Sequence, residues 1–141
     1  MNVIYDAGEM INVGIELGQI EGGMIMGLGW LKSEDLTWDE NGAKQRGTWE
    51  YKVPMHLDIP RKFSIKLTNK APEWKNIKNR NYPMSSKHAG ESSMVLSLVL
   101  KTAVQNAAEA FNPDSDLIIL PMKPNHVMQA IKLNKDSIIL T

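Results

Sequence analysis

A single carboxylate stands where a loop is expected to become a helix. The run Ser86-Lys87-His88-Ala89-Gly90-Glu91-Ser92 precedes residues 94–111, whose apolar side chains recur at three- and four-residue steps. We therefore predict a helix that ends at Phe111, with Glu91 in its first turn beside unpaired backbone N–H groups and the positive end of the helix dipole. This setting favours the ionised carboxylate, the form that a general base requires. Because glutamate is common at helix starts, a purely structural role is the alternative.

A glycine-rich segment near the N-terminus is the second candidate for chemistry. Apolar residues recur with helical spacing from Ile11 to Gly29, and five glycines interrupt them: Gly14, Gly18, Gly22, Gly23 and Gly27. Each glycine weakens a helix by about 1 kcal/mol relative to alanine. We predict a helix whose glycines allow close approach of a neighbouring element or of a ligand. A membrane-spanning role is excluded because the longest apolar run, Met24 to Leu31, is far too short.

The elements that must position these residues are short. We predict strands at Val3–Tyr5, Trp30–Trp38, Ala43–Gln45, Phe63–Leu67 and Leu117–Leu120, with Asn41-Gly42 forming a tight hairpin turn. A short helix is expected from Pro124 to Ile131, since proline is favoured at the first helical position. Residues 69–86 are predicted to form a long loop, and residues 134–141 a loose tail or an edge strand. The fold class is α+β, one partial domain over residues 1–141 with helices packed on mainly antiparallel strands.

Composition excludes several classes of function. The 16 basic and 16 acidic residues balance, which argues against binding to nucleic acid or to an anionic membrane. The basic stretch from Lys70 to Arg80 is predicted to be a solvated loop, with RNA contact as the alternative. Cysteine is absent, so this segment cannot ligate iron–sulfur clusters, and His56, His88 and His126 lie too far apart to predict a metal site. We expect a cytoplasmic protein, because the first residues lack the pattern of a signal peptide.

Several short motifs occur in the order found in one known family. They are Asp6-Ala7-Gly8 through Asn12, the glycine-rich stretch 15–29, Arg46-Gly47 with Tyr51-Lys52-Val53-Pro54 and Asp58-Ile59-Pro60, Ser86-Lys87-x-x-Gly90-Glu91, and Pro124-Asn125-His126-Val127. Together they resemble the C-terminal part of the molybdenum-binding portion of the molybdenum hydroxylases, the xanthine dehydrogenases and aldehyde oxidases. The resemblance runs from about Val3 to Ile131. It implies the fold of a C-terminal molybdopterin-binding subdomain.

The resemblance also implies roles for particular residues. Glu91 matches the catalytic base with which the family hydroxylates aldehydes or N-heterocycles, using water as the oxygen source. Gln19 matches a glutamine that contacts the pterin of the molybdenum cofactor, and its amide offers both a donor and an acceptor. Gly90 would let the backbone approach the metal closely. The alternative for Gln19 is an ordinary glutamine on a helix surface, and Lys87 is assigned a structural role.

Two positions in the active-site motif distinguish this chain from its family. His88 and Ala89 stand where a small, apolar pair is more usual, so an imidazole beside the loop could crowd the substrate or alter the ionisation of Glu91. The Gly-Glu-Ser sequence at 90–92 is closer to aldehyde oxidases than to xanthine dehydrogenases, which more often have proline after the glutamate. The substrate preference therefore depends on residues around Glu91.

The family enzymes are much larger than 141 residues. The resemblance places the iron–sulfur clusters, FAD and most substrate contacts in an upstream portion or a partner subunit, and family members are commonly homodimeric. We expect the isolated chain to lack a complete cofactor pocket, to be inactive alone and to expose apolar surface meant for the missing part. One alternative is a non-catalytic binding or regulatory module that docks on a full-length relative. Another is a generic α+β domain in which these motifs occur by coincidence.

Overall fold

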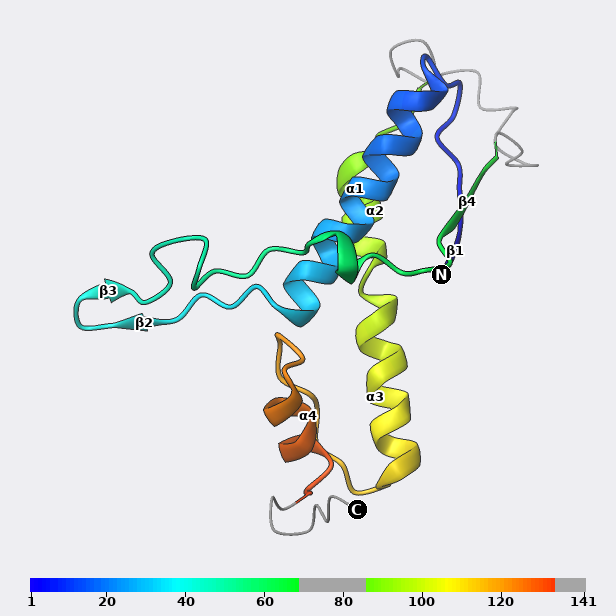
Figure 1. Cartoon of the computed structure of the whole chain (residues 1–141). Helices are drawn as coiled ribbons and strands as arrows, with labels where there is room; N and C mark the ends of the chain where they lie inside the picture. The colour runs from blue at the N-terminus through cyan, green and yellow to red at the C-terminus, as the bar shows by residue number, and fades with distance from the viewer. Residues whose placement is uncertain (69–85, 134–141) are drawn as a thin grey trace.

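The structure is a computed structural model that describes residues 1–68 and 86–133. In chain order its elements are β1 Asn2–Tyr5, α1 Val13–Lys32, β2 Trp38–Asp39, β3 Gly42–Ala43, the 3-10 turn η1 His56–Asp58, β4 Ser64–Leu67, α2 Gly90–Leu96, α3 Val99–Phe111 and α4 Pro124–Ala130. Figure 1 shows α1 and α2 side by side, with β1 and β4 next to them. Helix α3 continues below α2 with α4 alongside it, and the β2–β3 hairpin extends away from the helices.

Strands β1 and β4 form a two-stranded sheet that packs beside α1. They pair in parallel, with Val3 opposite Ile65. Val3, Ile20, Met24 and Ala89 are buried together as the core between this sheet, α1 and the start of α2. The expectation of mainly antiparallel strands is not confirmed, because among the described residues this longer pair of strands is parallel and the antiparallel pair, β2–β3, is short. A parallel pair requires a long crossover connection, and the segment that contains α1 supplies it.

Helix α1 forms as predicted, with shifted ends. The Asn12 side chain accepts a hydrogen bond from the backbone N–H of Ile15 at 3.1 Å, which caps the first turn. The helix continues to Lys32 and β2 begins only at Trp38, so the predicted strand Trp30–Trp38 is wrong except at its last residue. Leu31 is buried on the helix, and this burial favours one more helical turn over an extended chain. Among the described residues, no helix is both long enough and apolar enough to cross a membrane.

Small residues allow α1 and α2 to approach each other closely. A Cβ atom on Gly23 would overlap the side-chain oxygen of Ser93, and one on Gly27 would overlap that of Ser97. Both serines are buried in this contact. The expectation that these glycines serve close approach to a neighbouring element is therefore confirmed for Gly23 and Gly27.

The helix predicted through Phe111 is divided into α2 and α3 around Ser97 and Leu98. The Ser97 hydroxyl donates to the carbonyl of Met94 at 2.6 Å, and the Ser97 backbone N–H donates to the same oxygen at 3.2 Å. The Leu98 N–H likewise donates to the carbonyl three residues earlier, on Val95, at 3.1 Å. These bonds tighten the chain into a turn, as serine hydroxyls that bond back along a helix commonly do.

A second small core joins α3 to α4. Its buried members are Ala108, Ile118 and Ala130. The predicted strand at Leu117–Leu120 is wrong, because the side chain of Gln105 on α3 replaces a strand partner. The Ile118 N–H donates to Gln105 Oε1 at 2.9 Å, and Gln105 Nε2 donates to the carbonyl of Asp116 at 3.3 Å. Helix α4 confirms the predicted short helix, with Pro124 in its first turn.

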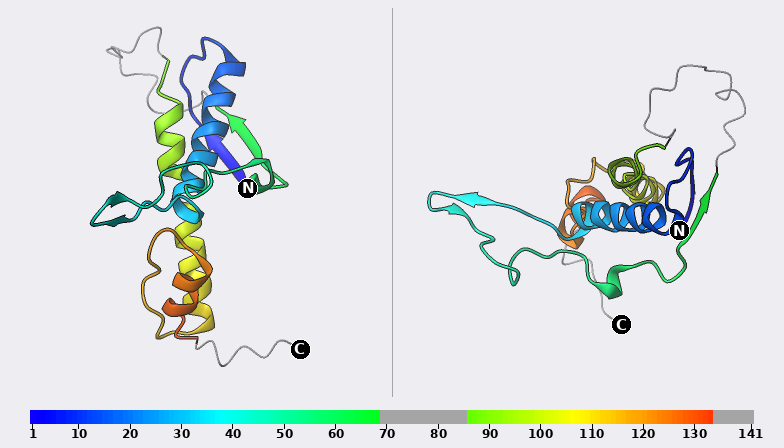
Figure 2. Two further views of the ribbon diagram at one scale, coloured as in Figure 1. Left: turned by 60° about the vertical axis from the view of Figure 1, so that its left-hand side comes forward. Right: turned by 90° about the horizontal axis from the view of Figure 1, so that it is seen from above.

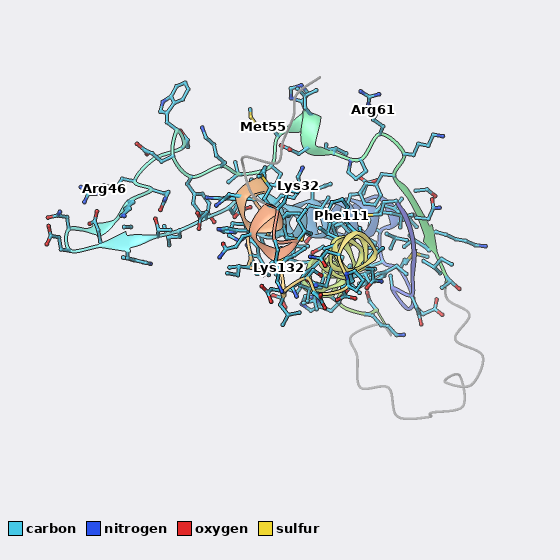
Figure 3. The ribbon with its side chains drawn as sticks, turned by 90° about the horizontal axis from the view of Figure 1, so that it is seen from below. Lys32, Arg46, Met55, Arg61, Phe111 and Lys132 are labelled. Carbon is cyan, nitrogen blue, oxygen red and sulfur yellow. The ribbon has the colours of Figure 1, made fainter. Side chains whose placement is uncertain are left out.

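The segment between α1 and η1 forms an arm that projects from the molecule, as both views in Figure 2 show. The predicted hairpin turn is confirmed, with Gly42 at a φ of 105°, but its strands are only two residues long. The expected return strand to Gln45 ends at Ala43, because Gln45 uses its side chain instead, accepting a hydrogen bond from the Thr37 N–H at 2.8 Å. Arg46 lies far out on this arm in Figure 3.

Two polar contacts tie the far part of the arm back to the end of α1. The Tyr51 hydroxyl donates to Glu34 Oε2 at 2.6 Å, and this bond raises the pKa of Tyr51. The Asp58 carboxylate accepts hydrogen bonds from the Met55 N–H at 2.9 Å and from Lys32 Nζ at 3.3 Å. These two bonds, in that order, lower the pKa of Asp58 from 3.8. Ionised Asp58 therefore stabilises the folded state above pH 3.8, and this stabilisation is lost as the pH falls through the lowered pKa.

We expect the α1–α2 contact to tolerate no side chain at Gly23. The Gly23→Ala variant should lower the free energy of unfolding by about 1–3 kcal/mol, because its Cβ overlaps atoms of α2. The matched control is Gly22→Ala on the same helix, where nothing lies within 4 Å of an added Cβ. The free energy of unfolding of that variant should rise by up to about 1 kcal/mol, because alanine favours a helix more than glycine does. Urea unfolding followed by circular dichroism measures both, and equal effects would contradict the assigned contact.

Candidate functional site

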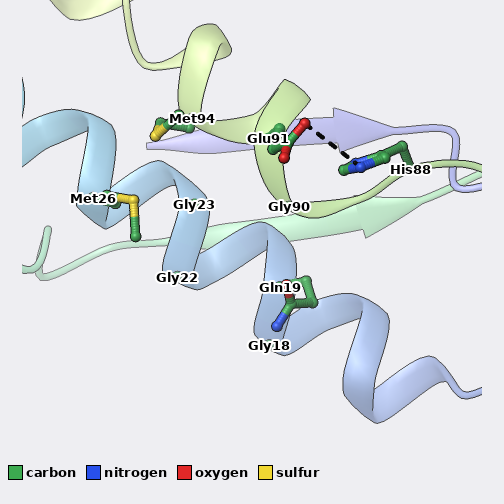
Figure 4. A pocket seen from close by; sticks show the side chains of 9 residues that line it. All are labelled: Gly18, Gln19, Gly22, Gly23, Met26, His88, Gly90, Glu91 and Met94. Atoms are coloured by element: carbon green, nitrogen blue, oxygen red, sulfur yellow. Dashed lines mark ion pairs between the residues drawn. The ribbon is translucent and has the colours of Figure 1, made fainter.

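A cavity of about 350 Å³ lies between α1 and the start of α2. It is lined by Gly18, Gln19, Gly22, Gly23, Met26, His88, Gly90, Glu91 and Met94. Figure 4 shows Met26 and Met94 at one side of this cavity and His88 at the other. All three residues singled out from the sequence, Gln19, Gly90 and Glu91, line it. The fold thus joins two motifs that lie about 70 residues apart in the chain.

Glu91 lies in the first turn of α2, as predicted. Its side chain is 82% exposed, and Oε2 lies 3.6 Å from Nε2 of His88. Because it is open to the cavity, this carboxylate is available to a bound molecule.

Gln19 lies on the exposed side of α1 and approaches the start of α2. A Cβ added to Gly90 would lie 3.0 Å from Gln19 Oε1, so the amide rests against the glycine backbone. Gly18 and Gly22 have open space where a Cβ would be. The wall of the cavity is therefore bare backbone on α1 with a single amide beside it, a surface that a flat polar ligand can approach closely.

The loop that carries Glu91 is fastened to the end of β1 by polar contacts that sequence analysis missed. The Tyr5 hydroxyl donates to the backbone carbonyl of His88 at 2.7 Å and also contacts the Ser92 hydroxyl. Lys87 Nζ lies 2.6 Å from Asp6 Oδ2, and both side chains are partly buried. These contacts, which we call the loop clamp, hold the backbone on both sides of Ala89.

Backbone pairing extends the loop clamp. The Lys87 N–H donates to the carbonyl of Ala7 at 2.9 Å, and Gly8 forms an isolated antiparallel bridge with Ser86. This arrangement confirms a structural role for Lys87. The one sequence signal for this ion pair was the opposite charge of Asp6 and Lys87, each near the start of a motif. Charge alone does not identify a partner, so Tyr5 and Asp6 were not predicted as site residues.

The structure separates the three histidines. His88 lines the cavity, His56 lies in η1, and His126 in α4 contacts the carbonyl of Pro121 through Nδ1 at 2.7 Å. Within residues 1–68 and 86–133, no group of three or more histidine, cysteine, aspartate or glutamate side chains is arranged to hold a metal ion. The Lys70–Arg80 stretch and the 134–141 tail lie outside the described residues.

Comparison with known proteins shows which family this chain and its fold resemble. Residues 1–60 match the family model of a molybdopterin cofactor-binding domain. The indole-3-acetaldehyde oxidase of Zea mays is 32% identical over 123 residues, which are 86% of this chain and 9% of that protein. The quinoline 2-oxidoreductase of Pseudomonas putida 86 superposes with a TM-score of 0.77 at 24% identity, over 93% of this chain and 16% of that one. A Cu,Mo-CO dehydrogenase gives a TM-score of 0.75 at 22% identity, over 94% and 16%.

The chain belongs to the molybdenum hydroxylase family, as its motifs indicated. The match of residues 1–60 to a molybdopterin cofactor-binding domain confirms the molybdenum cofactor predicted from the sequence. The chain spans only 9% of the length of the maize relative and 16% of the solved chains.

We expect Tyr5→Phe to loosen the loop that carries Glu91. The variant keeps the aromatic ring and removes the hydroxyl that bonds to the carbonyl of His88. The free energy that holds the loop closed should therefore fall by about 0.5–1.5 kcal/mol. Amide hydrogen exchange at residues 88–92 should become faster, by up to about tenfold. The control is Tyr51→Phe, which removes a hydroxyl from the arm. Unchanged exchange in Tyr5→Phe, or equal changes in both variants, would show that Tyr5 does not hold the loop.

Proposed function

We propose that this chain supplies the general base and a pterin contact to a larger molybdenum hydroxylase that oxidises aldehydes. The observation that carries the proposal is the single cavity in which Glu91 and Gln19 meet across Gly90. Two motifs distant in sequence converge there. Neither the α1–α2 contact nor the loop clamp uses either side chain, so both remain available for a ligand.

The residues around the cavity fit the cofactor that the family binds. Gly18 and Gly22 leave room against α1 that any side chain would fill. The amide of Gln19 offers a donor and an acceptor, which suits the edge of a pterin ring. When bound, the molybdenum cofactor would supply the two-electron oxidation of the substrate carbon, with water as the source of oxygen. The protein residues then need to orient the reactants and move a proton.

Glu91 is the residue in this cavity that can accept that proton at a carboxylate oxygen. A general base must be ionised, reachable and held in place. The carboxylate is exposed to the cavity, and the loop clamp fixes the backbone on which it stands. Gly90 carries no side chain between the glutamate and Gln19, so a cofactor can approach both at once. These features support the assignment of Glu91 as the base and Gln19 and Gly90 as cofactor contacts.

Aldehydes are the substrate class that we favour over N-heterocycles. The maize relative is named for an aldehyde, and other relatives at 31–35% identity are aldehyde oxidases from Arabidopsis and rice. The quinoline 2-oxidoreductase, at lower identity, is named for an N-heterocycle. Ser92 directly after Glu91 also agrees with the aldehyde oxidase pattern.

The missing portion of the enzyme is expected to cover much of this chain. Several large apolar side chains are exposed, among them Trp49 and Leu57 at 86% and Leu117 at 75%. Exposed apolar surface of this kind marks an interface. We propose that an upstream portion of the same enzyme, or a partner subunit, covers it and carries the iron–sulfur clusters and FAD. The isolated chain would then be inactive, while a homodimeric enzyme and a cytoplasmic location stay predictions.

The central test is Glu91→Gln in the enzyme that contains this chain. Turnover should fall at least about 100-fold, because the amide cannot accept a proton as a general base does. Molybdenum content should stay unchanged, since the cofactor contacts are kept. Glu21→Gln on the exposed side of α1 is the matched control and should keep full turnover. Near-normal hydroxylation by the Glu91 variant would remove Glu91 from the mechanism.

Association with a larger partner separates the enzyme segment from a chain that acts alone. We expect the 141-residue chain, purified from its source under mild conditions, to be retained with a larger molybdenum-containing polypeptide or as a part of one. Size-exclusion chromatography with a molybdenum assay measures this. If a stoichiometric full-length relative with its own intact active site is retained, the binding or regulatory module is favoured. A monodisperse monomer without molybdenum would contradict both.

A further inference from the structure

We propose that His88 is a positioning residue that holds the Glu91 carboxylate in place in the cavity. The inference rests on the proposed function of Glu91 as the base and adds a second side chain to that function. His88 occupies a position between the lysine and the glycine of the active-site motif, where the family more often has a small, apolar residue. The structure places its imidazole beside the carboxylate and in the lining of the same cavity.

The distance between the two side chains indicates the kind of contact they make. Nε2 of His88 lies 3.6 Å from Oε2 of Glu91 (Figure 4). This is longer than a direct hydrogen bond, which rarely exceeds about 3.2 Å, but within the range of an ion pair. The contact is therefore electrostatic and is strongest when the imidazole is protonated. It engages one carboxylate oxygen and leaves the other, Oε1, for the bound substrate and cofactor.

The backbone fixes the pair even though both side chains are exposed, His88 by 69% and Glu91 by 82%. The carbonyl of His88 accepts hydrogen bonds from Tyr5 Oη at 2.7 Å and from Ser92 Oγ at 3.2 Å. Ala89, the next residue, is buried in the core. The two side chains are three residues apart across the start of α2, a spacing at which they naturally meet. Their approach thus follows from the fold of the loop.

The surroundings leave Glu91 with one ionisable neighbour. Helix α1 contributes only glycines, Gln19 and Met26 to the cavity, and α2 adds Met94. Lys87 is paired with Asp6, and the hydroxyl of Tyr5 is bonded to the loop. Among the described residues that line the cavity, His88 and Glu91 are therefore the two that can carry a charge.

The first experiment measures the contact itself in the 141-residue chain, without the cofactor. The ¹³C resonance of the Glu91 carboxyl group, followed against pH by NMR, should show an inflection at the pH where the His88 ring titrates. The inflection should be lost in His88→Gln and His88→Ala and kept in His56→Gln, an exposed histidine outside the cavity. Amide dispersion shows that each variant is folded. A Glu91 resonance that ignores the titration of His88 would overturn the proposal.

The second experiment measures the consequence in the enzyme that contains this chain. His88→Ala should lower kcat about fivefold and change KM by less than about twofold, the scale of an exposed charge pair acting through another residue. His88→Gln keeps an N–H donor but not the charge, so its kcat should lie between those of the unmodified enzyme and of His88→Ala. An effect confined to KM, or no effect, would overturn the positioning role. If Glu91→Gln keeps full activity, the proposed function fails, while the NMR measurement still decides whether the pair exists.

Discussion

The close contact between α1 and α2 is the constraint on which the candidate site depends. Gly23 and Gly27 bring one backbone against Ser93 and Ser97 of the other helix, with no larger side chain between them. Gln19 lies one turn before Gly23, and Glu91 lies in the turn before Ser93. Both are therefore carried to the same cavity by the same contact. Glycine weakens a helix by about 1 kcal/mol per residue, so packing between the helices must offset that loss.

The end of β1 supplies a second constraint, which acts on the loop rather than on the helices. Tyr5 is the last paired residue of β1 and Asp6 follows it directly, so the sheet sets their positions. Their side chains reach the loop before α2 and hold its backbone through the carbonyl of His88 and the ammonium group of Lys87. The carboxylate of Glu91 is thereby presented from a fixed backbone while its own side chain stays open to the cavity. Rigid support under an accessible side chain is the arrangement expected of a general base.

The distribution of apolar residues leaves this chain with little core and much uncovered apolar surface. Its two cores are small, one around β1, β4 and α1 and the other around α3 and α4. The arm between α1 and η1 carries large apolar side chains with little to pack against, including Trp38 and Trp49. The chain spans 9% of the length of its maize relative and 16% of the length of the quinoline 2-oxidoreductase chain.

Local signals in the sequence were sufficient for the elements that depend on neighbouring residues. The helix from Val13, the short helix at Pro124, the hairpin at Gly42 and the helical position of Glu91 all follow from spacing, caps and turn chemistry within a few residues. The ordered motifs also identified the family, because their spacing along the chain is itself a sequence property. The family resemblance gave Gln19 and Gly90 separate roles toward the cofactor, and only the structure showed that they lie against each other.

Other features were decided only by contacts between distant residues. The parallel pairing of β1 with β4, the extension of α1 through Leu31 and the replacement of a strand by the Gln105 side chain each depend on a partner far away in the chain. The loop clamp depends on Tyr5 and Asp6 finding residues more than 80 positions later. Hydrogen bonding and packing are satisfied over the whole fold, so a local pattern cannot name the partner that satisfies them. Sequence alone thus predicted the residues that line the cavity, and tertiary structure decided which side chains hold their loop in place.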